Sequence, residues 1–320
     1  MKNKKIKLFV TGGSGFIGQH VIESLQKYNN VSITSLDVIY PNKKLKNVKY
    51  VLGTIMDKTS LIKMVKGHDK VLHLAAAIGV RKTAFDELNC LNVNIVGTIN
   101  ILDACLVNRI KDVLITSSSE VYGDVNKKPV HETSPFNPKS TYAVSKLSGE
   151  KYALAYASEF SLRPRIVRFF NIYGPGQSKD FVVSKFAEHC RMRKKITVYG
   201  DGSQIRAFCY VKDAADATAK IILSNRTLNK IYNIGNDKEP ISILDLAKRF
   251  CKLNNLDKSF IKKIDFKYSD RSSSREIYKR IPDITKIKEN LDYNPVYKLD
   301  DGIKLLMESV NNEKNNSGLS

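Results

Sequence analysis

Short β-rich apolar runs alternate with helical patterns through the first half of this chain, and no other feature constrains its fold as strongly. The expected strands are Ile6–Thr11, Val31–Asp37, Val48–Gly53, Lys70–Ala75, Val113–Ser117 and Arg165–Phe170. Between them, Ile17, Val21 and Leu25 recur along one helix face, and 92–107 has the pattern of a second helix. Strands that alternate with crossover helices form a parallel sheet. The sequence therefore predicts an α/β fold with a doubly wound parallel sheet.

The character of the chain changes after about residue 172, where loops rich in Gly, Pro and basic residues begin. Short strands are expected there at Ile196–Tyr199, Ala207–Val211, Ile231–Ile234 and Ile264–Tyr268. A chain of 320 residues is long enough for a large domain with a smaller lobe. We predict a first domain over 1–172 with a return helix near 213–224, a smaller C-terminal α/β lobe over 173–310, and a flexible polar tail over 311–320.

The basic composition of the chain does not by itself indicate a nucleic-acid partner. The sequence has 53 Lys and Arg against 32 Asp and Glu, which gives a formal net charge of +21, but the basic residues are spread along the whole chain. Single-stranded nucleic acid is bound by a basic groove with interleaved aromatic side chains, and the sequence has no such stripe. We expect a lysine-rich solvated surface, part of whose charge attracts an anionic small molecule, and no nucleic-acid partner.

Cysteine, histidine and hydropathy patterns argue against several further classes of protein. The five cysteines form no CxxC pair and lie in apolar periodic segments, so we expect reduced core residues. The five histidines offer no metal-ligand spacing, so no metal site is expected. No run of about 18 apolar residues occurs, and the lysine-rich N-terminus leads straight into a strand pattern. These features predict a soluble cytoplasmic protein without a membrane partner.

A glycine-rich loop follows the first expected strand and opens the first helix. It reads Thr-Gly-Gly-Ser-Gly-Phe-Ile-Gly over 11–18, with Gly12, Gly15 and Gly18 at the TGxxGxxG positions. Glycines allow close approach of the backbone to a pyrophosphate, and the helix N-terminus supplies N–H donors. The next strand ends at Asp37, whose carboxylate can accept hydrogen bonds from both hydroxyls of an adenosine ribose and would repel a 2′-phosphate. The pattern predicts a Rossmann-type site for NAD rather than NADP.

A Tyr–Lys pair and a cluster of hydroxyl groups provide candidate chemistry. Tyr142 and Lys146 are four residues apart, so they share one face of the helix expected after 137–141. The strand over 112–116 runs into Ser-Ser-Ser-Glu-Val-Tyr-Gly at 117–123. Doubly wound sheets place their sites at the carboxyl ends of the strands. We therefore expect the catalytic groups at this edge of the sheet.

Together these motifs resemble the extended short-chain dehydrogenase/reductases, in particular the NAD-dependent nucleotide-sugar epimerase/dehydratase family, over nearly the whole chain. The resemblance implies that Ser118, Tyr142 and Lys146 form a catalytic triad. The residues that it places at the cofactor are Gly12, Gly15, Phe16, Ile17, Gly18, Asp37, Ile55, Leu74, Ala75, Ala76, Asn94, Tyr142 and Lys146. One departure is Thr54, because the family usually has an Asp near the adenine at that position.

The same resemblance implies a nucleotide-diphosphate sugar as substrate. Asn171, in Phe-Asn-Ile-Tyr-Gly-Pro, matches the residue that binds the diphosphate, and Arg206 ends a loop whose Arg holds the same group. Arg280, in Lys-Arg-Ile-Pro-Asp, matches a late Arg near the sugar or phosphate. The family also implies a homodimer with a four-helix interface, which would form on the helices over 92–107 and 140–160.

The chemistry that this resemblance implies is transient oxidation of the sugar at C4. Tyr142, assisted by Ser118, would take the C4 hydroxyl proton while hydride passes to NAD⁺. The pKa of a free Tyr is about 10, too high for a base at neutral pH. Lys146⁺ and the positive nicotinamide ring would both favour the phenolate.

Three outcomes of the resulting 4-keto sugar stay open: 4-epimerisation, 4,6-dehydration, and loss of a C6 carboxylate as CO₂. Ser119 and Glu120 join the catalytic set here, because dehydratases have an acid pair or Ser-Glu at these positions. Sugar-acid decarboxylases resemble Ser-Glu with a late Arg such as Arg280. Epimerisation, as in UDP-glucose 4-epimerases, needs only the triad and is the expected function. A protein that only binds NAD or RNA is a remote alternative, against which the intact triad argues.

Overall fold

Seven parallel strands form the central sheet of the computed structural model, which describes residues 5–78, 86–125, 129–268 and 277–317. The strands are β1 Ile6–Thr11, β2 Val31–Asp37, β3 Val48–Leu52, β4 Lys70–His73, β5 Asp112–Ser118, β6 Arg163–Phe169 and β11 Lys230–Ile234. Their spatial order is β11-β6-β5-β4-β1-β2-β3, so the direction of winding reverses between β1 and β4. This order is that of a doubly wound sheet, and it confirms the predicted Rossmann-type fold.

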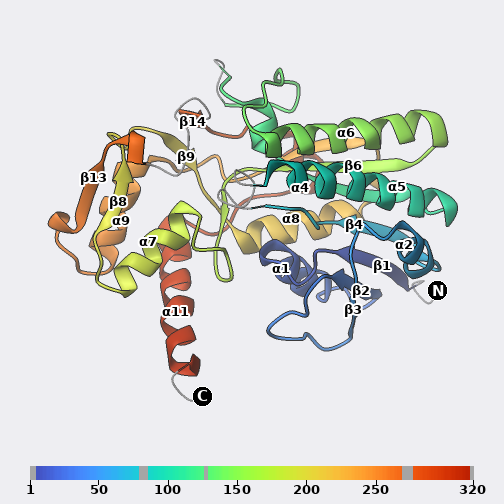
Figure 1. Cartoon of the computed structure of the whole chain (residues 1–320), viewed down its shortest axis with the longest axis horizontal. Coiled ribbons are helices and arrows are strands. Elements are labelled where there is room, and N and C mark those ends of the chain that lie inside the picture. The colour runs from blue at the N-terminus through green and yellow to red at the C-terminus, as the bar shows by residue number, and fades with distance from the viewer. Residues whose placement is uncertain (1–4, 79–85, 126–128, 269–276, 318–320) are drawn as a thin grey trace.

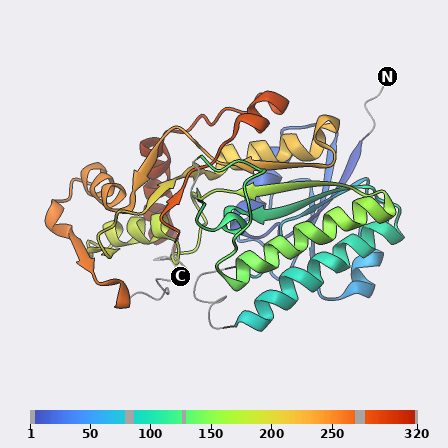
Figure 2. The same cartoon turned by 90° about the horizontal axis from the view of Figure 1, so that it is seen from above.

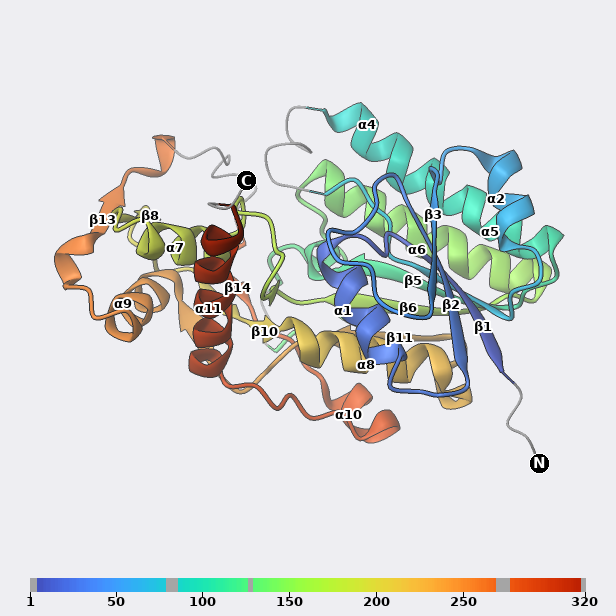
Figure 3. The ribbon, with the colours of Figure 1, turned by 90° about the horizontal axis from the view of Figure 1, so that it is seen from below.

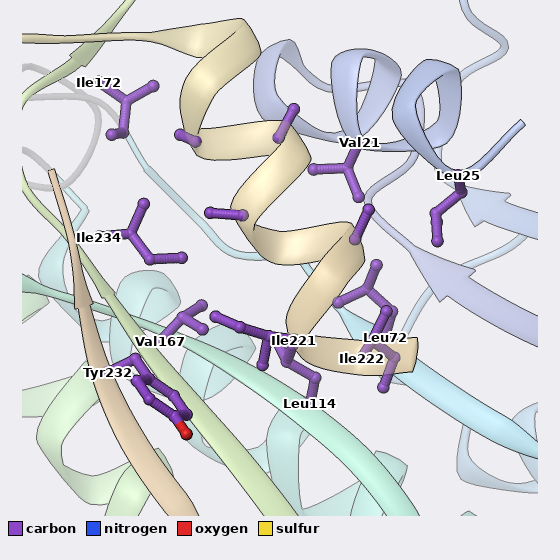
Figure 4. Packing of buried hydrophobic residues seen from close by; sticks show 14 of the residues in the cluster. Val21, Leu25, Leu72, Leu114, Val167, Ile172, Ile221, Ile222, Tyr232 and Ile234 are labelled. Atoms are coloured by element: carbon purple, nitrogen blue, oxygen red, sulfur yellow. The ribbon is translucent and has the colours of Figure 1, made fainter. Parts of the chain in front are cut away.

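Helices cover both faces of the sheet (Figure 1). α1 Phe16–Leu25 and α8 Val211–Leu223 pack together on one face, whereas α2 Lys58–Val65, α5 Gly97–Val107 and α6 Thr141–Phe160 lie on the other. Figure 4 shows the layer between α8, α1 and the sheet, where Ile221 and Ile222 lie beside Leu72 and Leu114. All four side chains are fully buried. Full burial of such a side chain stabilises the fold by roughly 1.5–3 kcal/mol.

The helix expected over 92–107 begins earlier and has an irregular middle. It consists of α4 Glu87–Leu91, a π-helical turn Asn92–Val96, and α5. By length and hydropathy alone, the continuous helix Glu87–Val107 could cross a membrane, and no other helix in the described ranges could. Because half of its apolar stretch is buried and it packs against α2 and α6, its hydropathy fits a core helix. π-Helical turns occur frequently at functional sites, and this one carries Asn94.

The second lobe lies beside the end of the central sheet (Figure 3). It has an apolar core of its own. Its main elements are α7 Val182–Arg191, β8 Ile196–Tyr199, β9 Ile205–Ala207, β12 Pro240–Ser242, α9 Ile243–Leu253, β13 Ile261–Ile264, β14 Lys279–Arg280 and α11 Leu299–Ser317. β12, β9 and β14 form one small sheet, and β13 pairs with β8 in another. Phe186 of α7 lies edge-on to Phe250 of α9, with 5.9 Å between the ring centroids.

The division of the chain at residue 172 differs from the expected one. The run Ile231–Ile234, expected in the second lobe, belongs to β11 and pairs with β6 in the central sheet. α8, in contrast, is the return helix expected near 213–224, and it packs against α1 as predicted. After forming part of the second lobe, the chain therefore returns to the central sheet. Local β propensity indicates a strand but does not tell which sheet it joins, because that choice depends on tertiary packing.

Three local expectations were also wrong. The strand expected at 207–211 is divided between the end of β9, β10 Cys209–Tyr210 and the start of α8. The strand expected at 264–268 ends at Ile264 as β13, and 266–268 form a 3₁₀ turn. Helix α11 continues through the expected tail as far as Ser317. In each case an apolar or polar run indicated the segment but not its boundaries.

A buried arginine ties three parts of the fold together. The side chains of Arg168 in β6 and Glu150 in α6 are 0% and 1% exposed, and two hydrogen bonds of 2.9 and 2.6 Å join them. The Nη1 atom of Arg168 also donates to the Tyr122 hydroxyl at 2.6 Å. That hydroxyl in turn donates to Asn233 of β11 at 2.7 Å. The cluster joins α6, the turn after β5 and the last strand of the sheet.

Candidate active site

The glycine-rich loop lies at the point where the winding of the sheet reverses, between β1 and β4. Gly12 has φ +74°, and a Cβ there would stand 2.5 Å from the backbone N of Ala75. A Cβ on Gly18 would stand 2.1 Å from the carbonyl O of Gly12. Only glycine fits at these two positions, because side chains would collide with backbone. Such a bare loop at the start of α1 suits the pyrophosphate of a dinucleotide.

Asp37 is half-buried at the end of β2 and faces this loop. One carboxylate oxygen accepts a hydrogen bond from the backbone N–H of Ser14 at 2.9 Å, and the other accepts one from Val38 at 2.7 Å. A carboxylate has about four acceptor sites, so both oxygens keep acceptor capacity for ribose hydroxyls. Its negative charge would repel a 2′-phosphate. The loop and Asp37 therefore fit NAD.

Replacing Asp37 with Ala should weaken NAD⁺ binding and reduce the discrimination against NADP⁺, because the ribose loses its acceptor and the 2′-phosphate loses its repulsion. Isothermal calorimetry with both cofactors measures the two effects. Asp69→Ala is a matched control, because Asp69 also accepts a backbone N–H, from Lys7, at the other end of the sheet. Tighter binding of NADP⁺ than of NAD⁺ to the unmodified protein would contradict the assignment.

His73 belongs to the His-Leu-Ala-Ala segment over 73–76, which also matches the family, and it forms a buried hydrogen-bonded junction that the sequence did not predict. Its Nδ1 is 2.7 Å from the hydroxyl of Thr11, and its Nε2 is 3.1 Å from that of Thr98. The Thr98 hydroxyl already donates to the carbonyl of Asn94 at 2.6 Å, so Nε2 must carry the proton. Burial, together with the charge of Lys146, lowers the pKa of His73 to about 3. His73 is thus a neutral tie between β1, β4 and α5.

Asn94 in the π-helical turn connects the segment after β4 to α6, the helix that carries Tyr142 and Lys146. Its side chain accepts the backbone N–H of Ala77 at 2.7 Å and donates to the carbonyl of the same residue at 3.1 Å. It also donates to the Ser145 hydroxyl at 2.9 Å, and that hydroxyl donates to the carbonyl of Tyr142 at 2.8 Å. From the π turn, the side-chain amide of Asn94 thus hydrogen-bonds both to the segment after β4 and to α6.

Tyr142 and Lys146 lie one turn apart on α6, at the edge of the sheet where β5 ends. Burial lowers the pKa of Lys146 to about 8, although the negative charge of Glu150 counteracts this. Burial also raises the pKa of Tyr142, and Glu120 raises it further, whereas the hydrogen bond with Ser118 lowers it. The sequence predicts that Lys146 and the positive nicotinamide ring of a bound cofactor together favour the phenolate. In the protein without a cofactor, burial has the largest effect on the pKa of Tyr142 and opposes that form.

The hydroxyl cluster forms a tight turn at the end of β5. The Ser118 hydroxyl accepts the backbone N–H of Glu120 at 3.2 Å and so begins a 3₁₀ turn over 119–122. The Ser119 hydroxyl is buried and has no hydrogen-bond partner among the described residues. Glu120, one-third exposed, lies 3.7 Å from Nη1 of Arg280, measured from Oε1. The turn thus brings an acid and a distant arginine together beside Tyr142.

Of the three expected substrate residues, Arg206 and Arg280 come from the second lobe, and Asn171 follows β6 of the central sheet. Arg206 and Arg280 are register partners on the neighbouring strands β9 and β14. Asn171 has φ +45° and donates from Nδ2 to the carbonyl of Ala207, next to Arg206, at 3.2 Å. Part of the Arg206 guanidinium is held by backbone, because Nη1 donates to the carbonyls of its neighbour Ile205 at 3.0 Å and of Tyr278 at 3.2 Å.

The segment that carries Arg280 is fixed to the first lobe by backbone hydrogen bonds. Val130 donates to the carbonyl of Ile281 at 2.8 Å, and Asp283 donates to the carbonyl of Val130 at 2.8 Å. The Nε atom of Arg280 is buried and has no partner within the described part of the chain. Arg280 therefore presents a positive group with unused hydrogen-bonding capacity to the site.

Of the other residues expected at the cofactor, most lie beside the glycine-rich loop, but Ile55 does not present its side chain there. Phe16 and Ile17 begin α1, and Leu74, Ala75 and Ala76 follow β4 directly beside Gly12. Ile55, in contrast, is 5% exposed and packs against Gly97 of α5. Its side chain belongs to the core, so only its backbone is left to meet a cofactor.

This chain is similar to proteins of known function, both in sequence and in structure. A sequence profile described as the NAD dependent epimerase/dehydratase family matches residues 8–235. A UDP-N-acetyl-alpha-D-glucosaminuronate decarboxylase from Bacillus cytotoxicus is 34% identical over 94% of this chain and 96% of its own. UDP-glucose 4-epimerase from Thermotoga maritima, solved with UDP-glucose, is 27% identical with a TM-score of 0.87, covering 97% of this chain and 100% of its own.

A third relative shows the cofactor in place. The dTDP-glucose 4,6-dehydratase DesIV from Streptomyces venezuelae, solved with NAD bound, has a TM-score of 0.89 and 25% identity, and the match covers 97% of this chain and 98% of that one. The three relatives are a decarboxylase, an epimerase and a dehydratase. With its cofactor cradle, its Ser-Tyr-Lys set and these relatives, the chain belongs to the NAD-dependent epimerase/dehydratase family, and it is an NAD-dependent enzyme.

Proposed function

We propose that this enzyme oxidises a nucleotide-diphosphate sugar at C4 and then removes a C6 carboxylate as CO₂. The observation that carries the second step is Arg280. Its guanidinium faces the site opposite Glu120, at 3.7 Å, with the buried Nε unpartnered among the described residues. A guanidinium is the group best suited to hold a carboxylate. The decarboxylase relative from Bacillus cytotoxicus supports the same assignment.

The residues of this chain would divide the first step among them. NAD⁺, held by the loop after β1 and by Asp37, would supply the hydride acceptor for C4. Tyr142 would take the C4 hydroxyl proton, and Ser118 would orient that hydroxyl or carry the proton. Lys146, charged below its pKa of about 8, would favour the phenolate form of Tyr142.

The second step follows from the chemistry of a C4 ketone. A ketone at C4 with a carboxylate at C6 is a β-keto acid, whose C5–C6 bond breaks so that its electron pair moves toward the C4 oxygen and CO₂ leaves. Arg280 would hold the carboxylate until it departs. C5 then needs a proton, which a water molecule held by Glu120, 3.7 Å from Arg280, would supply. C4 would take its hydride back from the reduced cofactor and its oxygen would take a proton from Tyr142, so the net change is the loss of CO₂.

The 4-epimerisation expected from the sequence is the second candidate. It requires only Ser118, Tyr142 and Lys146, which this chain has, and the Thermotoga maritima epimerase has the same fold. It gives no role to Arg280 beyond the diphosphate. The two candidates therefore differ in whether the substrate carries a carboxylate at C6.

Products from a panel of nucleotide sugars distinguish the candidates. The panel contains UDP-N-acetylglucosaminuronate, UDP-glucuronate, UDP-glucose, UDP-N-acetylglucosamine and dTDP-glucose. Mass spectrometry should show loss of CO₂ from one of the first two. Unchanged mass with inversion at C4 by NMR would establish epimerisation instead, and loss of water from a neutral sugar would establish dehydration.

We also propose a homodimer that forms through α4, α5 and α6. These helices lie side by side on one outer face (Figure 2) and expose large apolar side chains. The exposed fractions are 75% at Leu88, 61% at Val107, 42% at Val144, 37% at Leu154 and 46% at Phe160. Exposed apolar residues that gather on neighbouring helices indicate an interaction surface.

Substituting this helix face should separate the dimer. Val107→Glu with Leu154→Glu should convert a sedimenting species of twice 36.1 kDa into one of 36.1 kDa, because charges would be buried in the interface. Val296→Glu is the control, since Val296 is 79% exposed on a loop before α11. A monomeric unmodified protein would contradict the proposal. We further propose a cytoplasmic location, which the five free, buried thiols support.

A further inference from the structure

Ser140 is the last residue before α6, and two hydrogen bonds meet at its hydroxyl. Its backbone is extended, and its Oγ accepts the N–H of Ala143 at 3.1 Å, which caps the helix that carries Tyr142. The same Oγ lies 3.1 Å from Oε2 of Glu120. The other oxygen of Glu120, Oε1, lies 3.7 Å from Nη1 of Arg280. Each oxygen of the carboxylate thus has its own partner, one from each lobe.

The single proton of the Ser140 hydroxyl determines what this contact can be. The N–H of Ala143 needs an acceptor, so the Oγ lone pairs serve the helix cap and the proton is free to donate to Glu120. The carboxylate also lies near the N-terminus of a 20-residue helix, where the positive end of the helix dipole favours a negative charge. The contact therefore fixes the Glu120 carboxylate against the first residue before α6, the helix that carries Tyr142 and Lys146.

We propose that Ser140 is a positioning residue that holds the Glu120 carboxylate in a fixed position relative to Tyr142 and Arg280. It acts through Glu120 and contacts no substrate itself. The inference rests on the proposed function only in giving Glu120 a role in the chemistry at C5 and C6. The capping role alone would make Ser140 a structural residue, so the two roles must be separated by experiment.

Substitutions at Ser140 separate its acceptor from its donor. Thr keeps both, Asp keeps the acceptor that caps α6 but has no proton to donate at neutral pH, and Ala removes both. Asp and Ser are about equally good helix caps. With UDP-N-acetylglucosaminuronate as substrate, Ser140→Asp and Ser140→Ala should lower kcat about tenfold or more, with little change in KM for NAD⁺. Ser140→Thr should retain kcat.

A matched control exists at the start of α9. The Ser242 hydroxyl caps that helix by accepting the N–H of Asp245 at 3.0 Å, and it donates to the carboxylate of Asp245 at 2.7 Å. Ser242→Ala removes the same pair of hydrogen bonds away from Glu120. It should lower thermal stability about as much as Ser140→Ala does, and it should leave kcat unchanged.

A double-mutant comparison tests whether Ser140 acts through Glu120. In the Glu120→Gln background, Ser140→Ala should cause no further fall in kcat, because the carboxylate that it positions is already gone. Equal fold-losses in both backgrounds, or full kcat in Ser140→Asp, would overturn the inference. If Glu120→Gln itself has no effect, the role of Glu120 in the proposed function fails.

A crystal structure of Ser140→Ala needs no substrate and decides the positional claim separately. The Glu120 side chain should leave the place that it occupies in the crystal structure of the unmodified protein, whereas the backbone of the turn over 119–122 should stay. A Glu120 carboxylate that keeps its place without the Ser140 hydroxyl overturns the inference, whichever nucleotide sugar the enzyme turns over.

Discussion

Turnover of the Tyr142→Phe variant should fall by about 10²- to 10⁴-fold, the usual contribution of one catalytic proton transfer. The variant loses only the hydroxyl that would exchange a proton with the C4 oxygen, so nucleotide-sugar binding should persist. Stopped-flow absorbance at the NADH band, with calorimetry for UDP binding, measures both. Tyr152→Phe is the control, because Tyr152 lies on the same helix and is 41% exposed. Unimpaired turnover in Tyr142→Phe would show that another group is the base.

Replacing Arg168 with Met should lower the free energy of unfolding by about 3–5 kcal/mol, because it leaves the carboxylate of Glu150 buried without its ion-pair partner. The change also removes a hydrogen-bond donor to the Tyr122 hydroxyl. Denaturation by urea, followed by circular dichroism, measures the shift of the midpoint.

The exposed pair between Lys27 and Asp216 provides the comparison. Its two charged groups are 2.7 Å apart, but their side chains are 64% and 44% exposed. Lys27→Met should therefore change the free energy of unfolding by about 0–1 kcal/mol. Combining Arg168→Met with Glu150→Leu should recover much of the lost stability, since an apolar replacement of a whole buried pair is often neutral. Equal losses at the two sites would contradict the importance of burial.

The first unit of the fold could be predicted because its signals are local. Each pattern that predicted it occupies a short stretch of sequence: alternating strands, helices with a period of 3.6 residues, and the glycine-rich loop. The cofactor site likewise depends on particular residues such as Gly12 and Asp37. The family resemblance added Ser118, Tyr142 and Lys146, which the fold brings to one edge of the sheet. The placement of β11 beside β6 could not be predicted in this way, because it depends on contacts made after the chain has left and returned.

The polar junctions of the site were missed for a different physical reason. His73, Thr98 and Ser140 matter through the direction of single hydrogen bonds, which no residue pattern encodes. The rise in the pKa of Tyr142 in the protein without a cofactor could not be predicted either, because the sequence shows neighbouring charges but not the depth at which the hydroxyl is buried. The π-helical turn that aims Asn94 at Ala77 and Ser145 is likewise invisible to a helical periodicity count.

The return of α8 and β11 to the first unit means that the two lobes cannot be obtained as separate proteins. A fragment ending at residue 172 would carry β6 as an open sheet edge and would leave bare the surface of α1 that meets α8. Unpaired edges and uncovered apolar faces favour aggregation over folding. Because the chain crosses between the two lobes repeatedly, both lobes must be synthesised and must fold as one polypeptide.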